Sequence, residues 1–405
     1  MQKYNLKMNH ISSAVSLVKE LVAAPSVTPC DAGLIAKMSD YLSELGFEVT
    51  CFECKGVKNM IAKRYFSEGP ALAFSGHVDV VPVTQDRWHT DPFQACIIDD
   101  VIYGRGVTDM KGGIAAMLSA TRRLISSTDK LQGTFYWLLT SDEEGEAEFG
   151  TKKIAQRLMD AGIKLDACLI GEPTSSERVG DVIRNGRRGS ISGTITIKGK
   201  AGHVAYPEQT SNAAHLAGQV IAVLSKCVWR KDQNNTKTTL QVTAVRTSSD
   251  VDNIVPAGCD INFNIRYSHA YTNAEIIHII ESELVKFSTN LTLNWSRACT
   301  PYYTNLNIDN CFIRVVEQAI VRCTGRAPLV NTAGGTSDGR FFANGYTQVI
   351  ECGVRNSTIH QANENLAVSE LLEIEQIYFA ILDDFFTYGC KKNHSIENKD
   401  FAHCY

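Results

Sequence analysis

Apolar and polar positions alternate along the first part of the chain in a way that predicts helices and strands in turn. Helical spacing of apolar residues covers 9–24, 32–46, 112–126 and 150–161. Short apolar runs typical of strands cover 71–81, 133–140 and 167–172. Strands that alternate with helices predict an α/β layer with a largely parallel sheet.

The pattern changes at Gly189. Strands are predicted at 190–199, 237–245, 259–267 and 290–298, with helices at 211–227 and 273–287. This order, β-α-β-β-α-β, is typical of a ferredoxin-like module. After residue 302 the first pattern returns, with helices at 309–323 and 368–386 around a strand at 348–353. We therefore predict an α/β domain over 1–188 and 303–390, an inserted module over 189–302 and a polar tail over 391–405.

Composition narrows the class of protein. A chain of 405 residues is too long for one ordinary hydrophobic core, so we expect more than one folded unit. A content of 44% hydrophobic and 21% charged residues is typical of a soluble globular protein. A net charge of −4 with no basic block gives no reason to expect a nucleic-acid or anionic membrane partner. No apolar run reaches the ~18 residues of a membrane span. The 13 scattered cysteines favour a reducing compartment, so we expect a cytoplasmic protein.

Histidines and carboxylates stand at the ends of the predicted strands or in the loops that follow them. They are His77, Asp79, Asp109, Glu143, Glu144, Glu172 and His360. Each alone has an ordinary explanation, such as a hydrogen-bonded core histidine, a helix cap or a solvated turn. Because α/β sheets bind ligands at the carboxyl ends of their strands, the set together predicts a metal site.

Two histidines and three or four carboxylates are more than one ion needs. They suit two Zn²⁺ or similar divalent ions that share a carboxylate, at about 3.5–4 Å separation. A glutamate left over would be available to carry protons. The residues by themselves leave open which carboxylate bridges.

Five motifs carry a resemblance to a known family. SGHVDVVP, YGRGVTDMKGG, TSDEEG, IGEPT and TIHQANE follow one another in the order of the co-catalytic zinc deacylase and carboxypeptidase family, which the chain resembles from about residue 9 to about 386. The resemblance implies a zinc-exopeptidase-like catalytic domain with an inserted ferredoxin-like lid and dimerisation domain. It also implies a homodimer and two Zn²⁺ per subunit, with Co²⁺ as a possible substitute.

The resemblance also implies a role for each ligand. His77 and Glu172 would hold one zinc, Glu144 and His360 the other, and Asp109 both. Asp79 would hydrogen-bond the ring of His77, and Glu143 would serve as general base and acid.

Four further motifs point to a substrate class. NGRRGS (185–190), GKAGHVAYP (199–207), DNIVPA (252–257) and AGGTSDGRF (333–341) resemble family members that remove a succinyl group from a diamino dicarboxylic acid. The expected substrate is a small dicarboxylate amide, bound by Arg187, Asn253, Arg266, Gly335, Thr336, Ser337 and Asn356. His203, from the partner subunit, would stabilise the oxyanion. Another acyl-amino-acid deacylase, an exopeptidase and a non-catalytic protein of the same fold remain alternatives.

Overall fold

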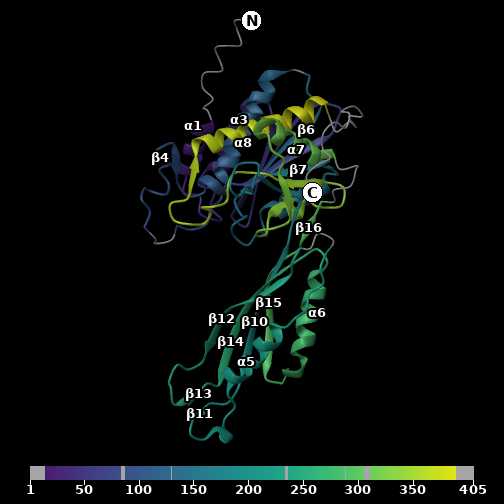
Figure 1. Ribbon diagram of the computed structural model, residues 1–405. Coiled ribbons are helices and arrows are strands. Elements are labelled where there is room, and N and C mark those ends of the chain that lie inside the picture. The colour runs from purple at the N-terminus through teal and green to yellow at the C-terminus, as the bar shows by residue number, and fades with distance from the viewer. Residues whose placement is uncertain are drawn as a thin grey trace. The chain divides into compact units, whose positions relative to one another are not determined.

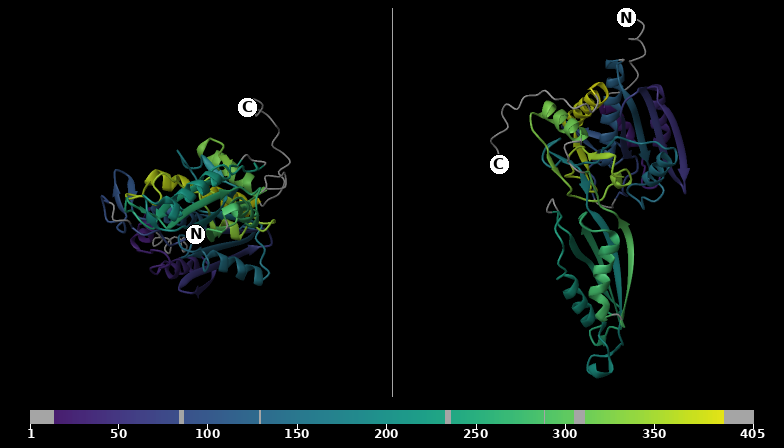
Figure 2. Two further views of the ribbon diagram at one scale, coloured as in Figure 1. Left: turned by 90° about the horizontal axis from the view of Figure 1, so that it is seen from below. Right: turned by 90° about the vertical axis from the view of Figure 1, so that its right-hand side faces the viewer.

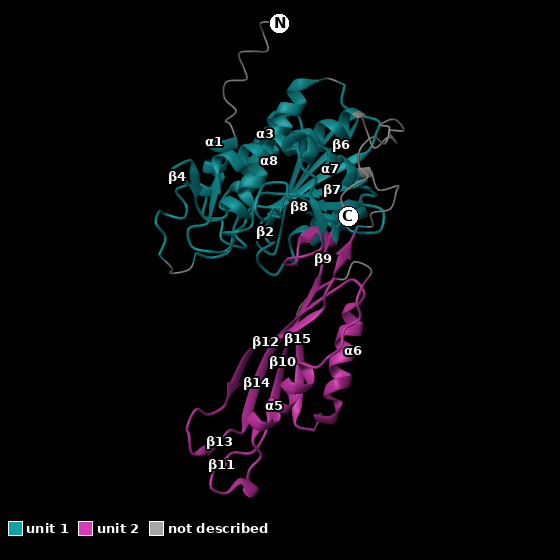
Figure 3. Cartoon of the chain, in the orientation of Figure 1, with its two compact units in different colours: residues 1–185, 304–331, 341–405 teal, residues 186–303, 332–340 magenta. Residues whose placement is uncertain are grey.

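The computed structural model describes residues 14–83, 87–128, 130–232, 236–287, 289–304 and 311–388. The chain divides into two compact units (Figure 3). The first takes in 1–185, 304–331 and 341–405, and the second 186–303 and 332–340. The segment 332–340 lies outside the range predicted for the insertion. It joins the second unit because Arg187 donates to the carbonyl of Ala333 (3.3 Å) and Gly339 lies against the ring of Tyr302.

An eight-stranded sheet forms the centre of the first unit (Figure 1). In sheet order its strands are β1 (Glu48–Cys54), β2 (Val57–Ser67), β6 (Gly133–Thr140), β3 (Ala71–His77), β7 (Ala167–Ile170), β18 (Gln348–Glu351), β8 (Val182–Arg184) and β17 (Leu329–Asn331). The central strands β6, β3, β7 and β18 are parallel neighbours. Their carboxyl ends therefore meet at one edge of the sheet.

Strand β2 was not predicted from the sequence. It pairs antiparallel with β1 and with β6, so the sheet is parallel only in its centre. A two-residue turn at Lys55 and Gly56, both with positive φ (53° and 85°), closes the β1–β2 hairpin. Lys58, Lys63 and Arg64 interrupt the apolar pattern of β2, and this hid the strand.

Both faces of the central sheet are covered. Helices α1 (Ala14–Ala23), α2 (Leu34–Glu44), α3 (Gly112–Ser127), α7 (Cys311–Thr324) and α8 (Val368–Asp383) share the main core with one face (Figure 2). There Phe74 packs against Trp137, with ring centroids 4.8 Å apart. Helix α4 (Thr151–Asp160) contacts β2 and β6 outside that core. Within the described ranges, no helix combines the length and the apolar character that crossing a bilayer requires.

The second unit contains a four-stranded antiparallel sheet in the order β12 (Thr239–Thr247), β14 (Gly258–Tyr267), β10 (Gly189–Lys198), β15 (Leu291–Cys299). Helices α5 (Ala213–Leu224) and α6 (Asn273–Leu284) share its apolar core, in which Ile195 and Phe263 are buried. Along the chain these elements run β-α-β-β-α-β, as the sequence predicts.

Short elements complete the two units. Strands β5 (Val101–Tyr103), β4 (Cys96–Ile98) and β19 (Asn365–Ala367) form a small sheet, and β9 (Gly186–Arg187) pairs with β16 (Tyr302–Tyr303). Strand β11 (Gly202–His203) pairs with β13 (Ile254–Val255). Single turns are η2 (Val107–Lys111), η3 (Pro207–Gln209), η4 (Val285–Phe287), η5 (Asp338–Phe341) and η6 (Asp384–Tyr388).

Candidate metal centre

The central strands of the first unit deliver the predicted ligands to one edge. His77 is the last residue of β3, Glu143 and Glu144 follow β6, and Glu172 follows β7. His360 lies in the loop after β18, and Asp109 lies in η2, just before α3. Because neighbouring parallel strands end together, these side chains converge at the carboxyl edge of the sheet.

The carboxylate of Asp109 lies between the two histidines. Its Oδ1 is 3.3 Å from Nε2 of His77, and its Oδ2 is 3.3 Å from Nε2 of His360. Nε2 of His77 is also 3.5 Å from Glu172, and Nε2 of His360 is 2.9 Å from Glu144. One carboxylate whose two oxygens face two separate ligand sets has the arrangement needed to bridge two metal ions.

Glu143 belongs to the same cluster. Ligand atoms of His77, Glu143 and Glu172 all lie within 4.8 Å of one another, as do those of His77, Asp109 and Glu144. Glu143 therefore lies close enough to be either a metal ligand or a proton carrier. The metal content of a Glu143 variant distinguishes the two roles.

Burial and mutual repulsion oppose the ionised form of the carboxylates in the cluster. Burial raises the pKa of Glu172 to about 7, and it also raises the pKa of Glu144. Hydrogen bonds to Asp109 and Glu144 raise the pKa of His360 to about 10. A bound cation would stabilise the ionised form of buried carboxylates that raise the pKa of one another. The imidazole and carboxylate donors here are those that suit Zn²⁺ and similar divalent ions.

The ring of His77 hydrogen-bonds Asp79 through the main chain of that residue. Its Nδ1 lies 2.8 Å from the main-chain carbonyl oxygen of Asp79, whereas the nearest carboxylate oxygen of Asp79 is 3.6 Å away. A carbonyl only accepts hydrogen bonds, so Nδ1 carries the proton. In the neutral ring, Nε2 is then the nitrogen available to bind a cation beside Asp109 and Glu172.

The carboxylate of Asp79 holds another part of the site. It is fully buried and accepts hydrogen bonds from the main-chain N–H groups of Glu143 (3.3 Å) and Glu144 (3.2 Å). The strand β3 ends at His77, and this lets Asp79 turn towards the loop after β6. Asp79 therefore fixes the backbone of both glutamates.

We expect Asp79→Asn to lower kcat about 10–100-fold, the usual effect of removing a partner that orients a metal site. An amide offers one acceptor oxygen and turns an N–H group towards the remaining donor, so the loop of Glu143 and Glu144 loosens. Asp166→Asn is a matched control, because Asp166 also accepts a main-chain N–H group (Ala71, 2.7 Å) but at the other end of β3. Steady-state kinetics with measured metal content test this, and equal kcat in both variants would contradict it.

The predicted substrate residues fall into separate parts of the molecule. Arg187, Arg266, Gly335, Thr336 and Ser337 belong to the second unit. Burial raises the pKa of the Cys299 thiol, whereas a hydrogen bond from Thr336 and the charge of Arg266 both act to lower it. The two residues therefore lie near Cys299, at one end of that unit's sheet.

The remaining predicted substrate residues lie elsewhere. His203 and Asn253 lie on or beside the β11–β13 pair of the second unit, beyond the other end of β10. Asn356 lies in the first unit, where its N–H group donates to the carbonyl of Ser175. The predicted metal ligands thus lie together at one sheet edge, whereas the predicted substrate residues belong to different parts of the chain's two units.

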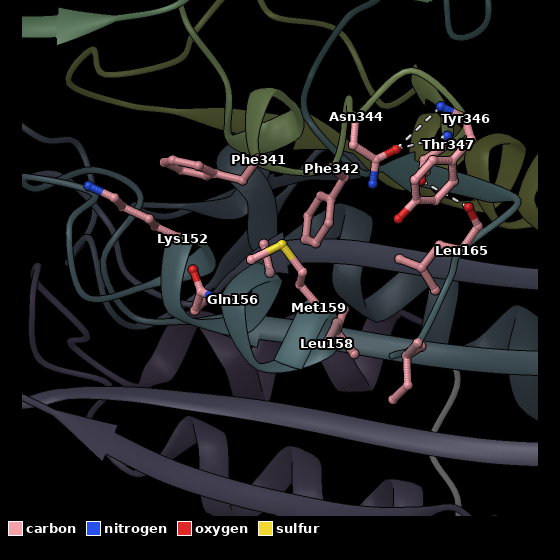
Figure 4. A pocket seen from close by; sticks show the side chains of 12 residues that line it. Lys152, Gln156, Leu158, Met159, Leu165, Phe341, Phe342, Asn344, Tyr346 and Thr347 are labelled. Atoms are coloured by element: carbon pink, nitrogen blue, oxygen red, sulfur yellow. Dashed lines mark hydrogen bonds between the residues drawn. The ribbon is translucent and has the colours of Figure 1, made fainter. Parts of the chain in front are cut away.

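An apolar pocket of about 380 Å³ lies between α4 and residues 341–347 (Figure 4). Met159 and Phe342 point into it, and Thr347 bonds the carbonyl of Leu165 at its rim. The pocket adjoins the starts of β7 and β18, so it lies at the sheet edge opposite the ligand cluster. Its lining contains no histidine, cysteine or carboxylate, so it is not the chemical site.

An α/β fold with clustered histidine and carboxylate ligands at the carboxyl edge of its sheet defines a metal-dependent hydrolase. The sequence model described as Peptidase family M20/M25/M40 matches residues 73–384, and the chain belongs to this family. The resemblance and the fold class predicted from the sequence are thereby confirmed.

Individual relatives agree with this assignment. The chain is 45% identical over 367 residues to succinyl-diaminopimelate desuccinylase 1 of Alteromonas mediterranea, covering 89% of this chain and 94% of the relative. It is 43% identical to succinyl-diaminopimelate desuccinylase 2 of Shewanella loihica, covering 91% and 98%. The fold matches the M20 family metallo-carboxypeptidase Sso-CP2 from Sulfolobus solfataricus with a TM-score of 0.78 at 17% identity, covering 92% and 99%.

One part of the site was missed in the sequence. Glu364 closes the motif TIHQANE but had no predicted role. In the structure it is fully buried and paired with Arg105. Arg105 likewise lies in the motif YGRGVTDMKGG. Both residues lie only four positions from a predicted ligand, and this proximity is the feature of the sequence that could have identified them.

Proposed function

We propose that this protein hydrolyses N-succinyl-L,L-2,6-diaminopimelate to succinate and L,L-2,6-diaminopimelate, in the biosynthesis of lysine and diaminopimelate. The observation that carries the proposal is the 45% identity to a desuccinylase over nearly the whole chain. The predicted metal ligands, which meet at one sheet edge, support a hydrolytic reaction on an amide. Ten of the cysteines in the described part of the chain are free thiols, which supports a reducing, cytoplasmic location.

The site would hold two Zn²⁺ per subunit, with Co²⁺ as a substitute. His77 and Glu172 would bind one ion, Glu144 and His360 the other, and Asp109 both. The distances of Asp109 to both histidines support this division. When bound, two divalent ions would lower the pKa of a water molecule and would polarise the carbonyl oxygen of the amide.

Glu143 would move the proton. It takes the proton of the attacking water and delivers it to the departing nitrogen, while the water oxygen joins the succinyl carbonyl carbon and the C–N bond breaks. The bond from its own N–H group to Asp79 supports this role, because it fixes the backbone from which the carboxyl group reaches the reacting atoms.

Substrate carboxylates would meet Arg187, Arg266 and the segment 335–337, with Asn356 as a further polar contact. Asn253 lies beside His203, so it would be supplied together with His203 by the partner subunit. Arginine suits bidentate binding of carboxylates. Arg187 is nearly buried, and its guanidinium donates to the carbonyl of Ala333, which brings it next to the glycine-rich segment. Burial and this bond preorganise it for an anionic ligand.

A homodimer would supply His203 from the partner subunit. Arg266 pairs with Ser190 near the start of β10, whereas His203 follows the end of that strand. Ten residues of strand span about 30 Å, too far for both side chains of one second unit to reach one small substrate. A second subunit removes this conflict, and its imidazole would stabilise the oxyanion.

The test compares steady-state rates on three substrates. We expect kcat/KM to be highest for N-succinyl-L,L-2,6-diaminopimelate, lower for N-acetylornithine and lowest for peptides, because only the first presents carboxylates at both ends to the arginines. A chelator should abolish the activity, and added Zn²⁺ should restore it. Faster turnover of the acetyl substrate would disprove the proposed substrate. Release of free amino acids from a peptide library would instead support an exopeptidase.

A further inference from the structure

A buried ion pair that the proposed reaction does not use lies beneath the ligand cluster. Arg105 Nη1 is 2.9 Å from Oε2 of Glu364, and both side chains are at most 1% exposed. Removing two charges from water is unfavourable unless further hydrogen bonds satisfy them. The position of such bonds therefore shows what the pair holds in place.

Glu364 binds the loop that carries Asp109. Its Oε1 accepts hydrogen bonds from the N–H groups of Thr108 (3.0 Å) and Asp109 (3.1 Å), and its Oε2 accepts from the N–H group of Gly106 (2.9 Å). The loop has no regular backbone here, since Gly106 has a φ of +80° and Asp109 leaves the helical region. The carboxylate of Glu364 takes the place of regular secondary structure in fixing the main chain of Asp109.

Arg105 and Glu364 also hold the loop that carries His360. The Arg105 guanidinium donates to the carbonyl of Gln361 (3.2 Å), the residue after His360. The N–H group of Gly104 donates to the carbonyl of Glu364 (3.0 Å). These bonds join two segments that the sequence places more than 200 residues apart.

We propose that Glu364, together with Arg105, is a positioning residue that sets the distance between Asp109 and His360 and so controls the affinity of the ion these two ligands share. This inference rests on the two-metal site proposed above. Glu364 touches neither substrate nor metal in this account, and it acts through the main chain of Asp109. The ion assigned to His360, Glu144 and Asp109 depends on both loops. The ion assigned to His77 and Glu172 depends on only one of them.

The test is the zinc affinity of Glu364→Gln, measured by titration against a competing chelator. An amide has one acceptor oxygen, so two of the four donors around Glu364 lose their acceptor. We expect the dissociation constant of the weaker zinc site to rise about 10–100-fold, the usual range for such partners, with a smaller change at the tighter site. At saturating zinc we expect kcat to recover most of its value while KM stays unchanged.

Glu375→Gln is the matched control. Glu375 accepts a hydrogen bond from Ser119 (2.7 Å) between α3 and α8, so it joins one helix to another and not one ligand loop to the other. It should lower the melting temperature and leave both zinc affinities unchanged. If Glu364→Gln behaves in the same way, the positioning role is disproved.

A second variant covers the case in which Glu364→Gln does not fold. Arg105→Lys keeps the buried positive charge but cannot hold Glu364 and the carbonyl of Gln361 with one planar group. It should weaken the same zinc site, and unchanged affinity would overturn the coupling between the loops. Zinc titration needs no substrate. Wild-type protein that binds two zinc ions but leaves the succinylated substrate intact would refute the proposed function and not this inference.

Discussion

Glu143→Gln is expected to lower kcat about 10²–10⁴-fold, the usual contribution of a general acid–base group, while both metal ions stay bound. The amide keeps the size of the side chain and its main-chain bond to Asp79, but it cannot take up the proton of the attacking water. Steady-state kinetics and metal analysis on the same preparation measure the two effects separately.

Glu146→Gln is the control for this variant. Glu146 lies in the same loop, is exposed and should have no effect on kcat or metal content. Two results would count against the assigned role of Glu143. Turnover near the wild-type rate would show that another group carries the proton. Loss of one ion would show that Glu143 is a ligand, in the group that it forms with His77 and Glu172.

Asp109→Ala is expected to remove both ions and all measurable activity. Each carboxylate oxygen of Asp109 is 3.3 Å from a different histidine, so the substitution takes one ligand from each ion and leaves the remaining buried carboxylates to repel one another. Glu144→Ala removes a ligand from one set only. We expect it to lose one ion and keep the other.

Metal content after dialysis tests this difference. Asp99→Asn is a suitable control, because Asp99 is exposed in a nearby turn with a φ of +49°, which asparagine also tolerates. Retention of one ion in Asp109→Ala would contradict the bridging assignment. It would place Asp109 with a single ion.

Local pattern was enough to find the elements with strong periodicity. Strand β6 has the predicted bounds, 133–140, because it is a continuous apolar run in a sheet covered on both faces. The second unit's order of strands and helices was also predicted, since each element has an apolar face at its own period. Strand β2 was missed because Lys58, Lys63 and Arg64 break its apolar pattern, although its backbone completes the sheet.

The residues of the site likewise differ in how far the sequence predicts their positions. That His77, Glu143, Glu144 and Glu172 would meet could be predicted, because they follow strands that an α/β fold sets side by side. The position of Asp109 between the two histidines was implied by the family resemblance, but the local pattern of the chain does not predict it. It depends on two irregular loops, and the buried pair of Arg105 and Glu364 holds them together.

The sequence by itself determined the family, the order of the elements and the identity of the candidate ligands. These follow from side-chain chemistry and short-range periodicity, which can be read directly from neighbouring residues in the sequence. Only the tertiary structure decided that Asp79 binds the loop of the two glutamates through its carboxylate and the ring of His77 through its carbonyl. Hydrogen bonds between distant loops depend on where the packed sheet places them, and no local pattern contains that information.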